Sequence, residues 1–175
     1  MLKTISKTIR RRRRGFSLLE LVVTTSLVGI TISAIAMLLR SSVSTWDAYE
    51  SDRSRLDAAH GVVRHFVRGL RQANAVTAIS NSSVTTGTIT VTTVDNQTAV
   101  WSLSGSQLMY TVGGVSEEIA DNVTAFTLSG RKADGTEATV VTDIRAVQIA
   151  VTILLDRDAN NTRTIRSTAW LRVKI

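Results

Sequence analysis

The sequence contains neither cysteine nor proline among its 175 residues, and only 5% of the residues are aromatic. Without cysteine, the chain has no disulfide, no thiolate nucleophile and no cysteine-ligated metal. Without proline, no proline kink or break interrupts a long helix. No Ser/His/Asp set, glycine-rich phosphate loop or pair of acid and base carboxylates can be assembled, so the sequence indicates no enzyme, cofactor or metal site.

The excess of positive charge is confined to a short N-terminal leader. The formal net charge is +7, from 21 basic and 14 acidic residues. Residues 1–15 hold seven of the basic residues and no acid, which leaves 14 basic residues against 14 acidic ones in the rest of the chain. A nucleic-acid-binding domain carries its positive field in the folded part. We therefore expect no direct nucleic-acid binding.

A mostly apolar stretch follows the leader. It covers residues 16–39, contains a single charge at Glu20, and is followed by Arg40. A membrane-spanning helix needs about 20 apolar residues, so this stretch is predicted to cross a membrane. The positive leader predicts a cytoplasmic N-terminus, with the residues after Arg40 on the other side.

Residues 40–78 are predicted to continue the same helix as an amphipathic segment. Apolar residues recur there at intervals of three and four, mostly with charged residues between them. No proline or glycine-rich break separates them from the apolar stretch, so one helix is expected from about residue 16 to the mid-70s. The stripe predicted to dock on a sheet comprises Trp46, Tyr49, Leu56, Val63, Phe66, Val67 and Leu70.

Residues 79–175 have the composition of an antiparallel β domain. Thr, Val and Ile alternate between turns rich in Gly, Asn and Asp. The last two candidate strands are expected to pair as a hairpin across residues 156–161. The expected fold class is α+β, with a long N-terminal helix packed on an antiparallel sheet. The candidate strands are 87–94, 98–103, 107–112, 122–128, 144–155 and 163–174.

The junction between leader and apolar stretch carries the most specific motif. It reads RGFSLLELVV, with Gly15, Phe16 and Glu20 as its fixed points. This junction resembles the prepilin-peptidase cleavage motif of type IV pilins and type II secretion pseudopilins. In that family a basic leader ends in glycine, phenylalanine usually begins the mature chain, and glutamate stands fifth in it.

The resemblance implies a processed filament subunit. Prepilin peptidase would cut between Gly15 and Phe16 and N-methylate Phe16, and Glu20 would pair with the amino terminus of a neighbouring subunit. The resemblance also implies a type IV pilin-like fold, a single-pass anchor in the bacterial inner membrane, and other pilin or pseudopilin subunits as partners. A lone carboxylate in a membrane helix costs about 2.5–3.5 kcal/mol, which favours a paired role for Glu20.

Three other interpretations of the N-terminus explain fewer residues. A plain signal-anchor accounts for the basic leader and the apolar stretch, but not for Glu20. A signal peptidase site at 34–36 would require an apolar region longer than the usual 7–15 residues. A twin-arginine signal at 13–14 also leaves the glutamate unexplained. The alternative function is a membrane-anchored or secreted β-rich binding protein that does not polymerise.

Two departures from the family pattern bear on the kind of subunit. Met37 stands where many major pilins have proline, and the C-terminal cysteine pair of many major pilins is missing. Residues 119–128, the Asp134-Gly135 turn and the last two strands resemble the C-terminal half of J-type pseudopilins and W-type minor pilins. That resemblance implies a minor subunit at the tip or in the priming complex of a filament.

Two further clusters were considered as metal sites. Asp156, Asp158 and Asn160 alternate as at the start of a calcium loop, but the expected glycine and glutamate are Asn161 and Ser167. A hairpin turn is the better interpretation. His60 and His65 are five residues apart, which does not place them on one helix face as zinc ligands would require.

Overall fold

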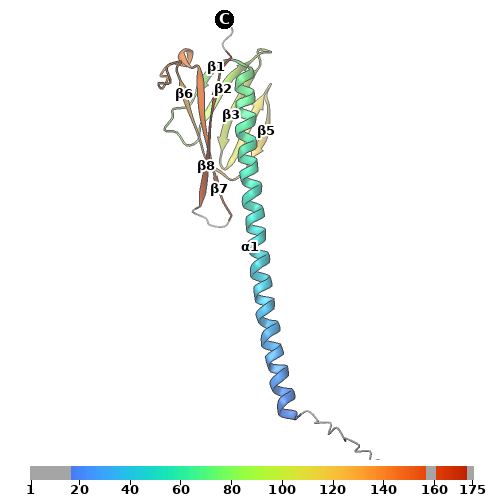
Figure 1. Cartoon of the computed structure of the whole chain (residues 1–175). Coiled ribbons are helices and arrows are strands. Elements are labelled where there is room, and N and C mark those ends of the chain that lie inside the picture. Colours follow the sequence, from blue (N-terminus) through green and yellow to red (C-terminus); the bar gives the residue numbers. More distant parts are fainter. Residues whose placement is uncertain (1–16, 157–160, 173–175) are drawn as a thin grey trace, which may run out of the picture. The chain divides into compact units, whose positions relative to one another are not determined.

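The chain forms one long helix followed by a β domain (Figure 1). This computed structural model describes residues 17–156 and 161–172. The chain divides into an N-terminal unit, Met1–Thr45, and a C-terminal unit, Trp46–Ile175. Helix α1, Leu18–Gln72, contributes residues to both. The predicted α+β class, with a long N-terminal helix packed on antiparallel β structure, is confirmed.

The C-terminal unit contains two antiparallel sheets where the sequence analysis expected one. Five strands form a meander in the order β1-β2-β3-β4-β5, and three form a second sheet in the order β6-β7-β8. The sheets meet along β6, where the Phe126 N–H donates to the Thr85 carbonyl and the Gly87 N–H to the Phe126 carbonyl, both at 2.7 Å. The strands are β1 (Ala73–Ile79), β2 (Thr88–Thr93), β3 (Thr98–Ser104), β4 (Gln107–Val112), β5 (Val115–Ala120), β6 (Val123–Arg131), β7 (Ala146–Leu154) and β8 (Thr162–Trp170).

Helix α1 joins the two sheets through one buried aromatic cluster. The Phe66 ring is fully buried and meets Trp101 of β3 edge-on, with centroids 5.3 Å apart. On its other side it meets Phe126 of β6, with centroids 6.3 Å apart. Edge-to-face pairs of this kind stabilise a core beyond the area that they bury. The same helix face also buries Ala59, Val62, Val63 and Leu70.

Part of the predicted docking stripe is wrong. Trp46 is 70% exposed and Tyr49 is 56% exposed, whereas Val63, Phe66 and Leu70 are buried as predicted. The first buried residue of α1 is Asp52, so the two aromatic residues precede the part of the helix that the sheets cover. Both keep the helical spacing of the stripe but stay exposed.

The helix ends earlier than predicted. Residues 73–79 form β1, which pairs with β2, so the expected helix as far as the mid-70s is wrong. Ala73 and Val76 are buried three residues apart, a spacing that also suits a helix face. Two register shifts in β1, between Ala73 and Ala75 and between Val76 and Ala78, break the alternation of a regular strand. The bulged strand therefore shows the period of a helix.

The six predicted strands are all present, with ends that differ by up to four residues. The predicted terminal hairpin is confirmed, with β7 and β8 paired from Ala146↔Trp170 to Leu154↔Thr162. Its residues 157–160 lie outside the described part of the chain. Strand β5 was not predicted because it lies at a sheet edge, and three of its six residues are exposed and polar. It follows a turn at Gly113 and Gly114, whose φ angles of 59° and 84° favour glycine.

Two glycines of α1 give a matched test of the packing of the helix against the sheet. A Cβ at Gly69 would lie 2.7 Å from Cζ2 of the fully buried Trp101, whereas a Cβ at Gly61 would meet nothing within 4 Å. Gly61→Ala should raise the free energy of unfolding by about 0.5–1 kcal/mol through helix propensity. Gly69→Ala should lower it by about 1–2 kcal/mol, because overpacking outweighs that gain.

Denaturant titration of the full chain in detergent micelles measures both variants. Equal stabilisation by the two alanines would contradict the close approach of α1 to Trp101.

Candidate functional site

The site predicted from the sequence lies at the start of α1. Gly15 and Phe16 fall outside the described residues, so the structure says nothing of their geometry. Glu20 lies in the first turn of the helix and is exposed. The helix macrodipole favours a negative charge at this end. Among the described residues, no side chain forms an ion pair with Glu20.

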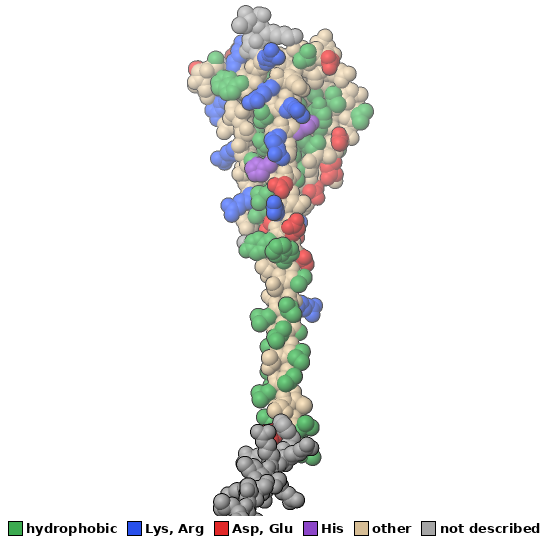
Figure 2. All heavy atoms as spheres, turned by 45° about the vertical axis from the view of Figure 1, so that its right-hand side comes forward, with side chains coloured by type: hydrophobic (Ala, Val, Ile, Leu, Met, Phe, Trp, Pro, Cys, Tyr) green, Lys and Arg blue, Asp and Glu red, His purple; other side chains and the backbone are tan. Residues whose placement is uncertain are grey.

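The helix after Glu20 is mostly apolar and carries no charged side chain as far as Leu39. An 18-residue window has a mean hydropathy of 2.2 and none of it is buried, so this part is long and apolar enough to cross a membrane. Figure 2 shows the apolar side chains along this stretch of α1. Exposure of more than half of each side chain in water is unfavourable, which points to lipid or to other helices as the surroundings. Within residues 18–39, the large apolar residues more than 55% exposed are Leu18, Leu19, Leu21, Leu27, Val28, Ile30, Ile32, Met37, Leu38 and Leu39.

The hydroxyl groups in this stretch are satisfied within the helix itself. Thr24 Oγ1 donates to the Glu20 carbonyl at 2.7 Å, and Thr31 Oγ1 donates to the Leu27 carbonyl at 2.8 Å. Ser33 Oγ likewise bonds the Gly29 carbonyl at 2.9 Å. Such bonds to the preceding turn let Ser and Thr enter a membrane without an unpaired donor. The Glu20 carboxylate cannot bond to a carbonyl of the preceding turn, because it can only accept hydrogen bonds or pair with a cation.

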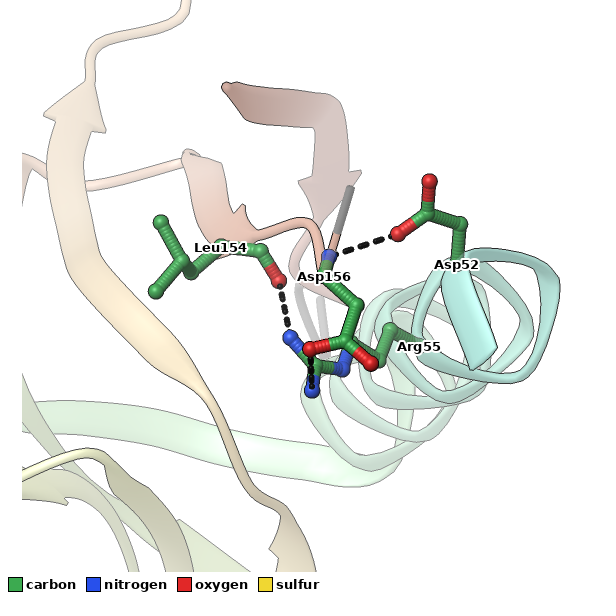
Figure 3. A network of polar contacts seen from close by, with 4 residues as sticks. All are labelled: Asp52, Arg55, Leu154 and Asp156. Atoms are coloured by element: carbon green, nitrogen blue, oxygen red, sulfur yellow. Dashed lines mark hydrogen bonds and ion pairs between the residues drawn. The ribbon is translucent and has the colours of Figure 1, made fainter. Parts of the chain in front are cut away.

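A second polar cluster joins α1 to the end of β7 (Figure 3). We call Asp52, Arg55, Leu154 and Asp156 the α1–β7 clasp. Asp52 is only 8% exposed, and its Oδ1 accepts the Asp156 backbone N–H at 2.6 Å. Arg55 donates to the Leu154 carbonyl and to Asp156 Oδ1, both at 3.1 Å. Together these bonds hold the end of β7 against the helix.

The clasp has a structural role and offers few free oxygen atoms to a metal cation. The Asp156 carboxylate, one of the calcium ligands considered from the sequence, pairs with Arg55. Asp158 and Asn160 lie outside the described residues. In the part of the chain that the structure describes, no group of three or more His, Asp or Glu side chains lies close enough to hold a metal ion.

His65 packs against the sheet as part of an aromatic cluster. Its Nδ1 accepts the Trp101 indole N–H at 3.3 Å, and Tyr110 meets its ring edge-on at 4.7 Å between centroids. Burial lowers the pKa of His65, an effect that Glu117 opposes and Arg68 reinforces. A neutral imidazole is also the form that can accept the indole N–H. The contacts of His65 therefore serve packing, although both His65 and His60 are exposed, and the two residues lie on different helix faces.

Substitutions at Asp52 test the clasp. Asp52→Ala removes the acceptor of a main-chain N–H and should lower the free energy of unfolding by about 1–3 kcal/mol. Asp52→Asn keeps an acceptor oxygen and should lower it less. Asp57→Ala, on the exposed face of the same helix, is the control and should change it by less than about 0.5 kcal/mol. Denaturant titration in detergent measures all three, and equal effects at positions 52 and 57 would show that the clasp contributes nothing.

Comparison with known families bears on the start of α1. Residues 10–39 match the family described as the prokaryotic N-terminal methylation motif. The matched range contains Gly15, Phe16 and Glu20, together with the whole apolar stretch of residues 16–39. No curated protein matches the chain. With the exposed apolar helix, this motif supports a processed subunit of the type IV pilin or pseudopilin kind, anchored in a membrane.

Proposed function

We propose that the chain is a structural subunit of a type IV pilus or a type II secretion pseudopilus. The observation that carries the proposal is the position of Glu20, in the first turn of an exposed apolar helix and inside a methylation motif. Prepilin peptidase cuts between Gly15 and Phe16 and N-methylates the new terminus. The absence of a side chain at Gly15 lets the enzyme approach the main chain closely.

Cleavage supplies a positive charge that can pair with the Glu20 carboxylate. Removal of the leader creates an α-amino group on Phe16, so each subunit carries one ammonium and one carboxylate at the head of its helix. When subunits stack, the Glu20 carboxylate of one pairs with the amino terminus of its neighbour. Each charge is unfavourable alone in lipid, and pairing removes much of that cost. The pair therefore favours assembly over the isolated membrane subunit.

The same cut changes the charge of the protein. The leader holds seven positive charges, and the residues after it hold equal numbers of basic and acidic side chains. Before cleavage the positive leader retains the N-terminus on the cytoplasmic side of the inner membrane. After cleavage a formally neutral subunit is left, with residues 16–39 as a single-pass anchor and the C-terminal unit outside the cytoplasm.

We further propose that the subunit is a minor one, at or near the tip. The missing cysteine pair and the likeness of residues 119–128 and the last two strands to J-type pseudopilins and W-type minor pilins support this rank. A minor subunit has other pilins or pseudopilins as its neighbours in the filament.

The mass of the mature N-terminus tests the proposal. The N-terminal peptide from purified membranes should begin at Phe16 and be heavier than the unmodified peptide by one methyl group. Gly15→Leu should leave uncut precursor in the inner membrane, because the added side chain blocks the approach of the peptidase. Gly29→Leu, where a Cβ meets nothing within 4 Å, is the control and should be cut normally. A terminus after Ala36, or an intact leader, would identify the non-polymerising alternative.

The role of Glu20 is tested separately. Glu20→Ala should leave insertion and cleavage intact but reduce the amount of subunit in sheared filaments by at least about tenfold, given the cost of an unpaired charge in lipid. Glu20→Gln should behave similarly, because it keeps the shape and loses the charge. Glu137→Ala, an exposed acid of the C-terminal unit, is the control. Normal incorporation of both Glu20 variants would contradict charge pairing.

A further inference from the structure

Strand β8 leaves a long edge of the second sheet open. It is the last strand in the order β6-β7-β8, and its nine residues pair with β7 without a register shift. Among the described residues, no other segment pairs with its outer edge. The outer edges of the first sheet are less suited to pairing, since β1 carries two register shifts and β5 has only six residues. A long, regular edge is a ready template for a further strand.

The hydrogen-bonding groups at this edge can be assigned from the ladder with β7. The Leu171 N–H donates to the Arg145 carbonyl at 2.9 Å, in register with the nine pairs that precede it. Bonded and non-bonded pairs alternate along an antiparallel ladder, so the odd-numbered residues of β8 bond to β7. The even-numbered residues direct their N–H and carbonyl groups to the open side. In the middle of the strand these are Thr164, Arg166 and Thr168, which are all exposed.

A hollow of about 530 Å³ lies between β8 and α1. The strand contributes Ser167, whose side chain projects to the opposite face from its even-numbered neighbours. The helix contributes apolar surface from Val63 and Val67. None of the described residues that line the hollow is acidic. The others are Arg64, Arg68, Arg71 and Gln72.

The arginines around the hollow lack a counter-charge within the described residues. The one ion pair found there joins Arg55 to Asp156. The three arginines of the hollow follow one another at intervals of one helical turn, a spacing at which like charges destabilise a helix. On the opposite face of β8, Arg166 is a further base beside the open edge. A strand added to this edge therefore meets positive charge on both of its faces.

We propose that β8 binds an extended acidic segment of a partner protein, which adds to the second sheet as a further strand. Its main chain bonds to the free N–H and carbonyl groups of β8, as in other complexes formed by strand addition. Its side chains alternate between the two faces, so those on the same face as Ser167 enter the hollow. Acidic side chains there meet the arginines of α1, and their methylene groups contact the two valines.

The charges at the site select this partner over other occupants. A basic strand would meet like charge on both faces, which makes its binding unfavourable. An apolar strand would bury the arginines without a counter-charge. A second copy of the chain offers β5 as an acidic edge, but Glu118 of that strand already accepts a hydrogen bond from Gln107 at 2.7 Å. A separate acidic segment satisfies the arginines without breaking that bond.

Binding of a defined peptide to the full chain in detergent micelles tests the inference. The probe is a capped fluorescent peptide of the length of β8, in which glutamate and valine alternate, and fluorescence anisotropy is the readout. We expect saturable binding that weakens as salt is raised, because charge contributes to it. The same peptide with lysine in place of glutamate should not bind. No saturable binding of the glutamate peptide would overturn the proposal.

Two substitutions at Thr168 separate strand addition from simple attraction between charges. Thr168→Pro removes an N–H at the open edge and leaves the N–H groups that bond to β7 in place. It should weaken binding at least about fivefold, because one hydrogen bond of the new ladder is lost. Thr168→Val keeps the N–H and is the matched control, with unchanged affinity. Equal affinities of the two variants would show that no strand is added.

Amide hydrogen exchange of the unaltered chain gives the same test without a substitution, should Thr168→Pro fail to fold. Bound peptide should slow exchange at the even-numbered residues of β8, because their N–H groups become hydrogen-bonded. The odd-numbered residues already bond to β7 and serve as the internal control. Unchanged exchange at the even-numbered residues, at a peptide concentration that saturates the anisotropy signal, would contradict strand addition.

Charge variants test the hollow. Arg64→Gln with Arg68→Gln should weaken binding of the glutamate peptide at least about fivefold, since both bases line the hollow. Arg53→Gln, at an exposed base of α1 outside the hollow, is the control and should not change it. Equal effects would contradict the assigned site. Dimers of the chain alone that Glu118→Lys abolishes would identify a second copy as the occupant and overturn the separate partner.

Discussion

One helix meets two different surroundings, and the rest of the structure follows from that constraint. Over residues 21–39, α1 carries no charged side chain, and none of its most hydrophobic window is buried. From Asp52 to Leu70 the same helix buries only one face, against two sheets. The unbroken helix is possible because no proline occurs in the chain. Lipid favours an apolar surface, as in the first part of the helix. A protein core favours a helix with one apolar face, as in the second part.

The C-terminal unit is organised around the side of α1 that carries Phe66. This ring contacts Trp101 in one sheet and Phe126 in the other, so the helix covers the place where the sheets meet. The α1–β7 clasp adds directional bonds at the end of the second sheet, through Asp52 and Arg55. Apolar burial supplies most of the stabilisation, and the clasp fixes the end of β7 against the helix.

Charge has a different role at each of its locations. In the proposed function the charge of the leader orients the chain in the membrane, and the single carboxylate of Glu20 in apolar surroundings favours association with a cation. The exposed charges of α1 in the C-terminal unit lie in water, where an ion pair is worth no more than about 1 kcal/mol. The pairing proposed for Glu20 is the stronger interaction, because it forms in lipid.

Residue patterns that depend on local chemistry could be predicted from the sequence, and those that depend on distant partners could not. The anchor, six strands and the β7–β8 hairpin follow from hydropathy and period, and the motif around Glu20 follows from its resemblance to a known cleavage motif. The end of α1 at Gln72 does not, because the bulges of β1 give Ala73 and Val76 a helical spacing that only pairing with β2 resolves. Edge strand β5 was missed for a related reason, since its exposed polar residues gain their conformation from β4.

The tertiary structure alone decided which face of α1 is covered and which is free. The sequence predicted that Trp46 and Tyr49 dock with Phe66, but the sheets begin their cover at Asp52 and leave both aromatic residues exposed. It also gave no sign that Asp52 accepts a main-chain N–H from a residue 104 positions away. The sequence by itself determined the apolar anchor of residues 16–39, because a segment in lipid is recognised from its composition alone. A folded core selects residues by contact, and contacts between distant residues exist only once the chain has folded.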